Sequence, residues 1–349
     1  MNLKKIFLTI LQVAVTMALL WWIFHDPEKR RQMLSALRQA DPLWLLPGFA
    51  CFGLVLVCAA IRWQLLMRVQ GIVIPLFRVW QLVMIGMFYN LFLPGGTGGD
   101  IVKILYAVKE APKSKSAVFL SVVVDRITGM FALILISAGV FLCYREILMA
   151  LPLVRAFLLA VGIIFGAFSA LIALGLVIDR FHLAKRLPQG MPGHAAILDI
   201  ARAFSIYARD WKAILGAILL SMPLNIFIFG AAIFSAFAFR GNPGASAMTS
   251  VIPIVNTISS LPISLAGIGV REKLFATMLH SLYGTPEDLG VLISITGFAI
   301  VVVWGLIGGV VSLMYRSGDG SETPIAGMEG QIEEIEQQVG AEEESEAKA

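Results

Sequence analysis

Charged side chains are scarce in this sequence. Asp, Glu, Lys and Arg make up 14% of its 349 residues, whereas soluble globular chains usually carry about 25% of them. Apolar residues account for 58% of the chain, and the mean hydropathy is +0.84. These values exclude a soluble globular protein. They predict an all-α integral membrane protein whose length suits one bundle of spanning helices and no second sizeable domain.

Cysteine is also rare, which excludes two kinds of site. The three cysteines, Cys51, Cys58 and Cys143, lie in apolar runs, and their spacing builds neither a zinc site nor a disulfide framework. The glycine-rich segment GGTGGDIVK departs from G-x-x-x-x-G-K-[ST] and follows no predicted strand, so no nucleotide site is expected. We expect no cofactor, no metal and no nucleic-acid partner.

Long apolar runs are what the sequence has instead. Six of them have the roughly 18 or more residues that a membrane-spanning helix needs. They lie near 5–24, 42–67, 117–143, 152–178, 213–238 and 288–314. The first starts like a signal peptide but lacks a small-residue cleavage site, so we expect a retained helix. Two further runs, 79–106 and 247–283, are interrupted, and 26–42 and 194–210 are predicted to be amphipathic surface helices.

Charge divides the chain into two parts. Residues 1–316 carry 26 Lys or Arg against 13 Asp or Glu, whereas residues 317–349 carry one Lys against ten acids. We therefore expect a transmembrane domain, 1–316, and an acidic tail, 317–349, whose composition is typical of disorder. Because cytoplasmic loops are rich in Lys and Arg, both termini are expected in the cytoplasm. The basic segment 28–32 is an exception to this orientation.

Each interrupted run is broken by residues that oppose a helix. The first contains PGGTGGD and the second NTISSLPISLAGIGVRE; a proline inside a helix costs roughly 3 kcal/mol and a glycine about 1 kcal/mol. The distribution of Lys and Arg makes the first run enter and leave from the cytoplasmic side and the second from the opposite side. We predict two oppositely oriented re-entrant helical hairpins in an inverted repeat, a pattern that marks a transporter's binding site.

The breaks and the charges near them supply the candidate substrate-binding or coupling residues. These are Asn90, Pro94, Gly96, Gly98, Gly99, Asp100, Lys103, Asp125, Arg126, Asn256, Pro262, Gly267, Gly269, Arg271 and Glu272. The start of each half-helix offers unpaired amides and a partial positive charge that suit a phosphate. Glycine lets the backbone approach a headgroup, and the asparagines could hold freed backbone groups or donate to the ligand.

Several of these residues also have a plainer structural interpretation. Asp100 could cap a half-helix and pair with Lys103 on one face, or it could act on a ligand or a proton. Asp125 and Arg126 could form a packing ion pair, or Asp125 could meet Lys103 while Arg126 holds a lipid phosphate. Glu272 could cap a half-helix at the surface or serve as a coupling carboxylate.

One further pair of residues is interpreted as part of the membrane interface. Arg62 and Trp63 follow an apolar run, and we expect them to anchor the helix end, with the arginine reaching out to the headgroups. The carboxylates of the candidate set are the expected proton or cation carriers of a transport cycle.

The same motifs carry a family resemblance. The segments YNLFLPGGTGGDIVK, SSLPISLAGIGVRE, IRWQLL and VVVDRITG, in order over about 1–316, resemble the lysylphosphatidylglycerol synthase transmembrane-domain family, which includes the flippase half of the bacterial multiple peptide resistance factor. The resemblance implies a bundle that moves a lipid between the leaflets of the bacterial inner membrane. Gly96 and Thr97 stand where relatives often have a basic residue, and Leu265-Ala266-Gly267 stands where they tend to have Pro-Gly-Gly.

The expected function is therefore a lipid flippase and not an enzyme. A phospholipid with an anionic or zwitterionic headgroup, aminoacylated or otherwise polar, would pass through a polar cavity between the hairpins. Movement would run downhill or be driven by ions or the membrane potential, and a lipid-modifying enzyme could supply the lipid. Two alternatives stay open: an intramembrane transferase acting on a lipid phosphate, and a regulatory or partner protein that docks through the acidic tail.

Overall fold

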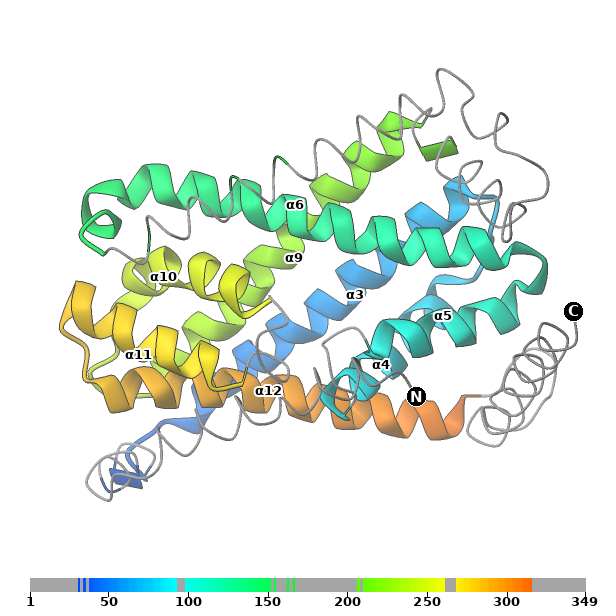
Figure 1. The fold of residues 1–349 in the computed structure, drawn as a ribbon. Helices are drawn as coiled ribbons and strands as arrows, with labels where there is room; N and C mark the ends of the chain where they lie inside the picture. Colours follow the sequence, from blue (N-terminus) through cyan, green and yellow to red (C-terminus); the bar gives the residue numbers. More distant parts are fainter. Residues whose placement is uncertain are drawn as a thin grey trace, which may run out of the picture.

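The computed structural model describes residues 38–92, 98–151, 210–260 and 268–315, with isolated positions 31, 34, 35, 154, 162, 166, 206 and 207. All regular structure in these ranges is helical, in agreement with the predicted all-α class (Figure 1). The elements are η1 (Pro42–Trp44), α3 (Leu45–Val69), α4 (Leu76–Phe92), α5 (Gly98–Glu110), η2 (Pro112–Ser114), α6 (Lys115–Leu148), α9 (Trp211–Phe237), α10 (Gly244–Ser259), α11 (Val270–Tyr283) and α12 (Glu287–Met314).

Four helical segments are long and apolar enough to cross a membrane. They are Pro42–Val69, which joins η1 to α3, and the helices α6, α9 and α12. The 25 residues of α3 extend about 38 Å at 1.5 Å per residue, more than the roughly 30 Å hydrocarbon core of a bilayer. These segments confirm four of the six predicted spans. The predicted spans 5–24 and 152–178, the predicted surface helices 26–42 and 194–210 and the acidic tail 317–349 lie wholly or mostly outside the described residues.

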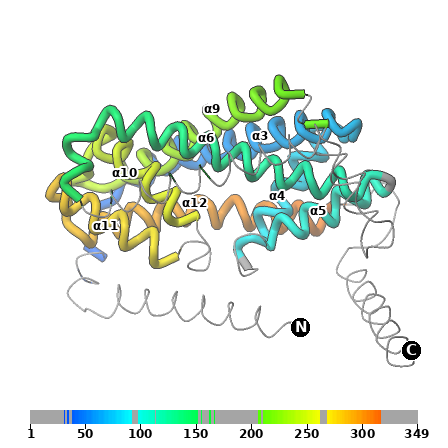
Figure 2. The backbone as a smooth tube through the Cα atoms, turned by 45° about the horizontal axis from the view of Figure 1, so that its top comes forward, coloured from blue at the N-terminus to red at the C-terminus, as the bar shows by residue number. Residues whose placement is uncertain are grey.

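The two interrupted runs each fold as a pair of helices. Helix α4 packs against α5, and α10 packs against α11, while the tips 93–97 and 261–267 lie outside the described residues. Short connections join α3 to α4 and α5 to α6 at one end of the molecule. Equivalent connections join α9 to α10 and α11 to α12 at the other end (Figure 1 and Figure 2). The two pairs therefore point into the molecule from opposite ends.

Each helix pair has its own apolar core. Around α4 and α5, the fully buried side chains include Trp63, Leu82 and Ile85. Around α10 and α11, they include Met248 and Met278. Both cores also draw residues from α6, and α12 packs against α4 near one end and α11 near the other. The long helices thus hold the two pairs in one bundle.

Glycine lets the helices approach closely at two contacts. A Cβ atom on Gly99 of α5 would lie 1.9 Å from the carbonyl oxygen of Gly86 on α4. A Cβ atom on Gly308 of α12 would lie 2.2 Å from the carbonyl oxygen of Met84. Inside a bilayer the hydrophobic effect does not bring helices together, because lipid tails are as apolar as leucine. Small residues instead let helices approach closely, so that van der Waals contact stabilises their association. Both contacts fix α4, which carries the first half of the broken hairpin.

We expect Gly99→Ala to destabilise the protein, because the added methyl group has no space between α5 and α4. Overpacking of this kind typically costs about 1–3 kcal/mol. The measurement is thermal unfolding of the purified protein in detergent. Gly139→Ala on α6 is the matched control, since a Cβ atom there meets nothing within 4 Å. Equal melting temperatures for the two variants would show that the Gly86–Gly99 contact is not tight in the protein.

Candidate functional site

A carboxylate in the first third of α6 is the centre of a buried group of charges. Arg62 Nε on α3 lies 2.8 Å from Asp125 Oδ1, and Lys103 Nζ on α5 lies 3.6 Å from Asp125 Oδ2. All three side chains are less than one-tenth exposed. Two spanning helices and one arm of the broken hairpin therefore meet at a single carboxylate, and the predicted approach of Asp125 to Lys103 is confirmed.

Neutral side chains complete the surroundings of these charges. The Arg62 guanidinium also donates to Ser221 Oγ on α9 at 2.8 Å, and a Cβ atom on Gly129 would come within 2.9 Å of it. Lys103 Nζ lies 3.8 Å above the ring of Trp63, whose indole nitrogen donates to Ser121 Oγ at 3.0 Å. The cations are thus held by hydrogen bonds and a π face in addition to the carboxylate.

A second ion pair extends the group toward the hairpin tip. Arg126 Nε donates to Asp100 Oδ2 at 2.5 Å. The Asp100 side chain is 15% exposed, whereas that of Arg126 is 49% exposed. We call the five residues Arg62, Asp100, Lys103, Asp125 and Arg126 the Asp125 cluster. Its Arg126 end is open, while its Arg62 end is closed within the bundle.

The Asp125 cluster holds three cationic side chains against two carboxylates. Each charge at the centre of a bilayer costs about 2.5–3.5 kcal/mol on insertion scales, and such residues usually face a cavity or one another. With both carboxylates engaged by cations, the cluster has one positive charge in excess. An anionic group of a ligand would balance it, and phosphate oxygens suit the planar donors of arginine.

The second hairpin carries its own carboxylate. Glu272 on α11 is only 2% exposed; it accepts from the Gly269 amide at 2.5 Å and from Arg271 at 2.8 Å. Ser294 Oγ on α12 donates to it at 2.9 Å. The guanidinium of Arg271 also stacks 4.7 Å above the ring of Phe298. Here one cation faces one carboxylate, so this group is neutral as a whole.

A small cavity lies beside the Arg271–Glu272 pair. Its volume is about 80 Å³, and its polar lining comes from Asn256 on α10, Arg271 on α11 and Ser294 on α12. A space of this size can hold one or two waters, each with a share of roughly 30 Å³ of liquid volume. Asn256 lines this cavity, whereas Asn90 is used structurally: its Oδ1 accepts from the Gly99 amide at 2.8 Å.

The structure corrects two interpretations of single residues and decides between the alternatives for a third pair. Asp100 is not an N-cap paired with Lys103: it lies within the first turn of α5 and pairs with Arg126. Glu272 does cap α11, but it is buried rather than at the surface. Asp125 and Arg126 pair with different partners, because neighbouring helical residues point about 100° apart.

Of the amides expected to be open at the half-helix starts, those of Gly99 and Gly269 are not free for a phosphate, since Asn90 and Glu272 already accept from them. The expectation that Asn90 could hold a freed backbone group is confirmed. One broader expectation is wrong. The arginine of the sequence IRWQLL is not an interfacial anchor, because Arg62 and its neighbour Trp63 are buried, at 7% and 0% exposure. An arginine that interrupts an apolar run was the available signal for Arg62. Nothing in the sequence singled out Ser221 or Ser294.

Four predicted site residues lie outside the described residues: Pro94, Gly96, Pro262 and Gly267. Gly98 and Gly99 begin α5, and Gly269 precedes α11 with a φ of 84°, a left-handed conformation that glycine favours. Within the part of the chain that the structure describes, no group of three or more His, Cys, Asp or Glu residues could hold a metal ion.

Another ion pair closes the outer end of the first helix pair. Arg78 of α4 donates to Glu110 at the end of α5 at 2.8 Å. Tyr315, directly after α12, donates to the same carboxylate oxygen at 2.6 Å. Burial, followed by the hydrogen bond to Glu110, raises the pKa of the Tyr315 phenol, so it stays protonated and donates. The outer ends of α4, α5 and α12 are tied together by this contact.

Comparison with known proteins finds a family and one relative. The family model described as the lysylphosphatidylglycerol synthase TM region matches residues 9–309. The UPF0104 membrane protein PH1989 of Pyrococcus horikoshii is 28% identical over 142 residues. That alignment covers 40% of this chain and 41% of the relative, so this match spans less than half of the curated protein. The described charge sites and both helix pairs lie inside the family match.

We expect Asp125→Asn to lower the free energy of unfolding by about 3–5 kcal/mol, the usual cost of breaking a buried ion pair from one side. The change leaves Arg62 and Lys103 without their shared carboxylate. Chemical or thermal unfolding in detergent measures it. Asp100→Asn is the matched control and should cost less, because its partner Arg126 is half-exposed. A larger loss for Asp100→Asn would contradict the central place of Asp125.

Proposed function

This chain belongs to the lysylphosphatidylglycerol synthase transmembrane-region family, and on that premise we propose that it moves a phospholipid between the two leaflets of a membrane. The membrane is the cytoplasmic (inner) membrane of the cell. The cargo has an anionic or zwitterionic headgroup, which is aminoacylated or otherwise polar. Its headgroup crosses through the polar region between the two helix pairs, while its acyl chains stay in the bilayer.

The Asp125 cluster is the observation that carries this proposal. It brings three cations and two carboxylates together inside the bundle: Arg62, Asp125 and Arg126 lie on α3 and α6, which are apolar enough to span a membrane, and Asp100 and Lys103 lie on α5 of the first helix pair. Arg126 supports a role in entry, since it is the half-exposed member and its guanidinium can reach a phosphate. Lys103 and Arg62 are buried more deeply than Arg126, so a phosphate that moves inward would leave Arg126 and bind Lys103 and then Arg62. A cluster needed for packing alone would not require the excess cation.

The order of elements supports an inverted repeat of two re-entrant hairpins. In each half a long helix is followed by a helix pair and then by a second long helix: α3, α4, α5, α6 and α9, α10, α11, α12. Each pair enters from the end of the molecule at which its flanking helices meet it (Figure 1). A carboxylate is the third residue of α5 and of α11, and each is paired with an arginine. Broken helices in corresponding places of two halves are typical of transporters.

We further propose that the protein makes and breaks no covalent bond in its lipid. Transport would then be downhill or coupled to ions or to the membrane potential, with Asp100 and Glu272 as the carboxylates nearest the hairpin tips. A separate lipid-modifying enzyme would supply the cargo. The ends of α3 and α5 that carry Arg68 and Lys109 would lie at the cytoplasmic face, because cytoplasmic segments of membrane proteins are rich in Lys and Arg.

The test is lipid movement in proteoliposomes that contain fluorescent phosphatidylglycerol, followed by the fraction that an external quencher reaches. We expect the protein to accelerate exchange between leaflets. Lys103→Ala and Arg126→Ala should each reduce the rate by about tenfold, equivalent to roughly 1.4 kcal/mol in the barrier. Arg240→Ala, at an exposed position beyond α9, is the control cation and should leave the rate unchanged.

Folding must be checked for every variant by its elution as a single species and by its helical content. Unchanged exchange in folded Lys103→Ala, Arg126→Ala and Glu272→Gln would contradict the flippase proposal. Chemical conversion of the fluorescent lipid in the same vesicles would favour an intramembrane transferase instead. Loss of a bound protein after deletion of 317–349, with exchange intact, would assign the tail an accessory role.

A further inference from the structure

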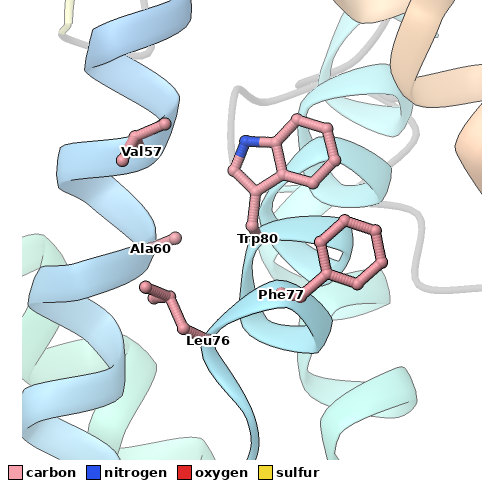
Figure 3. Close-up of a pocket in the computed structure, with 5 residues that line it drawn as sticks. All are labelled: Val57, Ala60, Leu76, Phe77 and Trp80. Carbon is pink, nitrogen blue, oxygen red and sulfur yellow. The ribbon is translucent and has the colours of Figure 1, made fainter.

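An apolar groove lies on the outside of the bundle, between α3 and α4. Its volume is about 500 Å³, within the roughly 300–1,000 Å³ of sites that hold small molecules. Its lining residues are Val57, Ala60, Leu76, Phe77 and Trp80. Figure 3 shows Val57 and Ala60 on the side of α3 toward α4, Leu76 between the two helices at the start of α4, and the rings of Trp80 and Phe77 further along α4. None of these residues belongs to the Asp125 cluster.

The groove exists because a small residue sits opposite large ones. Ala60 is fully buried and forms the floor, whereas the rings of Phe77 and Trp80 stack with centroids 5.8 Å apart and form one wall. The rim is open: Val57 is 39% exposed and Phe77 is 67% exposed. On a helix that crosses a membrane, such a rim faces lipid. The space between the rim residues is therefore open to an unbranched chain from the bilayer.

Apolar contact alone does not retain a lipid inside a membrane. Lipid tails are as apolar as leucine, so a tail gains little free energy of transfer by moving from bilayer to groove. Retention requires close packing along the groove and an attraction on the headgroup. The flat indole of Trp80 and the small side chain of Ala60 let an acyl chain pack closely along the groove. The attraction on the headgroup depends on the charges at the end of the groove.

Cations gather at the end where Leu76 begins α4. Arg68 lies exposed in the last turn of α3, Arg78 follows Phe77 directly, and Lys109 lies in the last turn of α5. The acidic group described among them, Glu110, is already bound by Arg78 and Tyr315. A headgroup at this level would meet more positive than negative charge. An anionic headgroup is favoured there, because nearby Lys and Arg side chains attract anionic lipids.

We propose that the groove between α3 and α4 holds one acyl chain of an anionic phospholipid, with the headgroup at the Arg68 and Arg78 end. This site does not depend on lipid movement between leaflets: a protein that only retained this lipid would have it too. It differs from the Asp125 cluster in that it is apolar, open to the outside and selective through charge at its end.

The experiment is photo-crosslinking of the full chain in phosphatidylcholine nanodiscs. The probe is phosphatidylglycerol with a diazirine in one acyl chain, added as a small fraction of the lipid, and phosphatidylcholine with the same label is compared with it. We expect the label on Val57, Leu76 or Trp80 to exceed that on the exposed face of α9 several-fold. It should also be several-fold stronger with the anionic probe.

Two variants and a control separate a specific site from general lipid contact. Val57→Trp fills the groove at its rim and should remove most of the labelling of Leu76 and Trp80. Leu219→Trp, at a 58% exposed position of α9, is the matched control and should leave it unchanged. Arg68→Gln should reduce the preference for the anionic probe without abolishing labelling. All variants are compared at equal helical content and with a single elution peak.

Other occupants would give different and contrary results. Equal labelling on all exposed faces, unaffected by Val57→Trp, would show annular lipid only and overturn the proposal. So would crosslinks between a photoreactive residue at Phe77 and residues 5–24 of the same chain, because a protein segment would then fill the groove. Crosslinks to a second copy would overturn it in the same way. A protein that did not accelerate lipid exchange in proteoliposomes but still gave the labelling described above would contradict the proposed flippase function and support this site.

Discussion

The ion pair between Arg62 and Asp125 is the contact on which the arrangement of the first half depends. It joins two helices that cross the apolar region, and Lys103 brings α5 to the same carboxylate. This contact is strong because it is buried: an unpaired charge inside a bilayer costs several kcal/mol. The three helices are therefore held in the arrangement that pairs their charges. Ser221 extends the same constraint to α9.

Close backbone contact is the second constraint, and it acts where charge does not. The glycines of α4, α5 and α12 allow carbonyl groups and neighbouring backbones to approach without side chains between them. Inside lipid this van der Waals contact substitutes for the hydrophobic effect. The first helix pair is thus fixed by charge against α3 and α6 and by small residues against α12. Helices α4 and α5 run from one end of the molecule toward its middle (Figure 1).

The two halves share an order of elements but differ in charge. The first half has an excess cation and an open end at Arg126, whereas Glu272 and Arg271 neutralise one another in the second. Asp100 of the first half and Glu272 of the second both lie in the first turn of a helix, where the macrodipole favours negative charge. In the proposed inverted repeat, this unequal charge suits a path whose two ends treat a lipid headgroup differently. It is the asymmetry that the proposed transport cycle would use.

The sequence by itself determined the membrane class, four of the spans and the positions of both helix breaks. Hydropathy and the helix-breaking cost of glycine and proline are local properties, so no knowledge of neighbours is needed. Asn90 beside Gly99 and Lys103 beside Asp125 were also within reach, since freed amides and buried charges require partners. Only the tertiary structure decided that Arg62 is buried against Asp125 and that Asp100 pairs with Arg126. Helical periodicity gives the direction of a side chain, but packing alone decides which helix stands opposite.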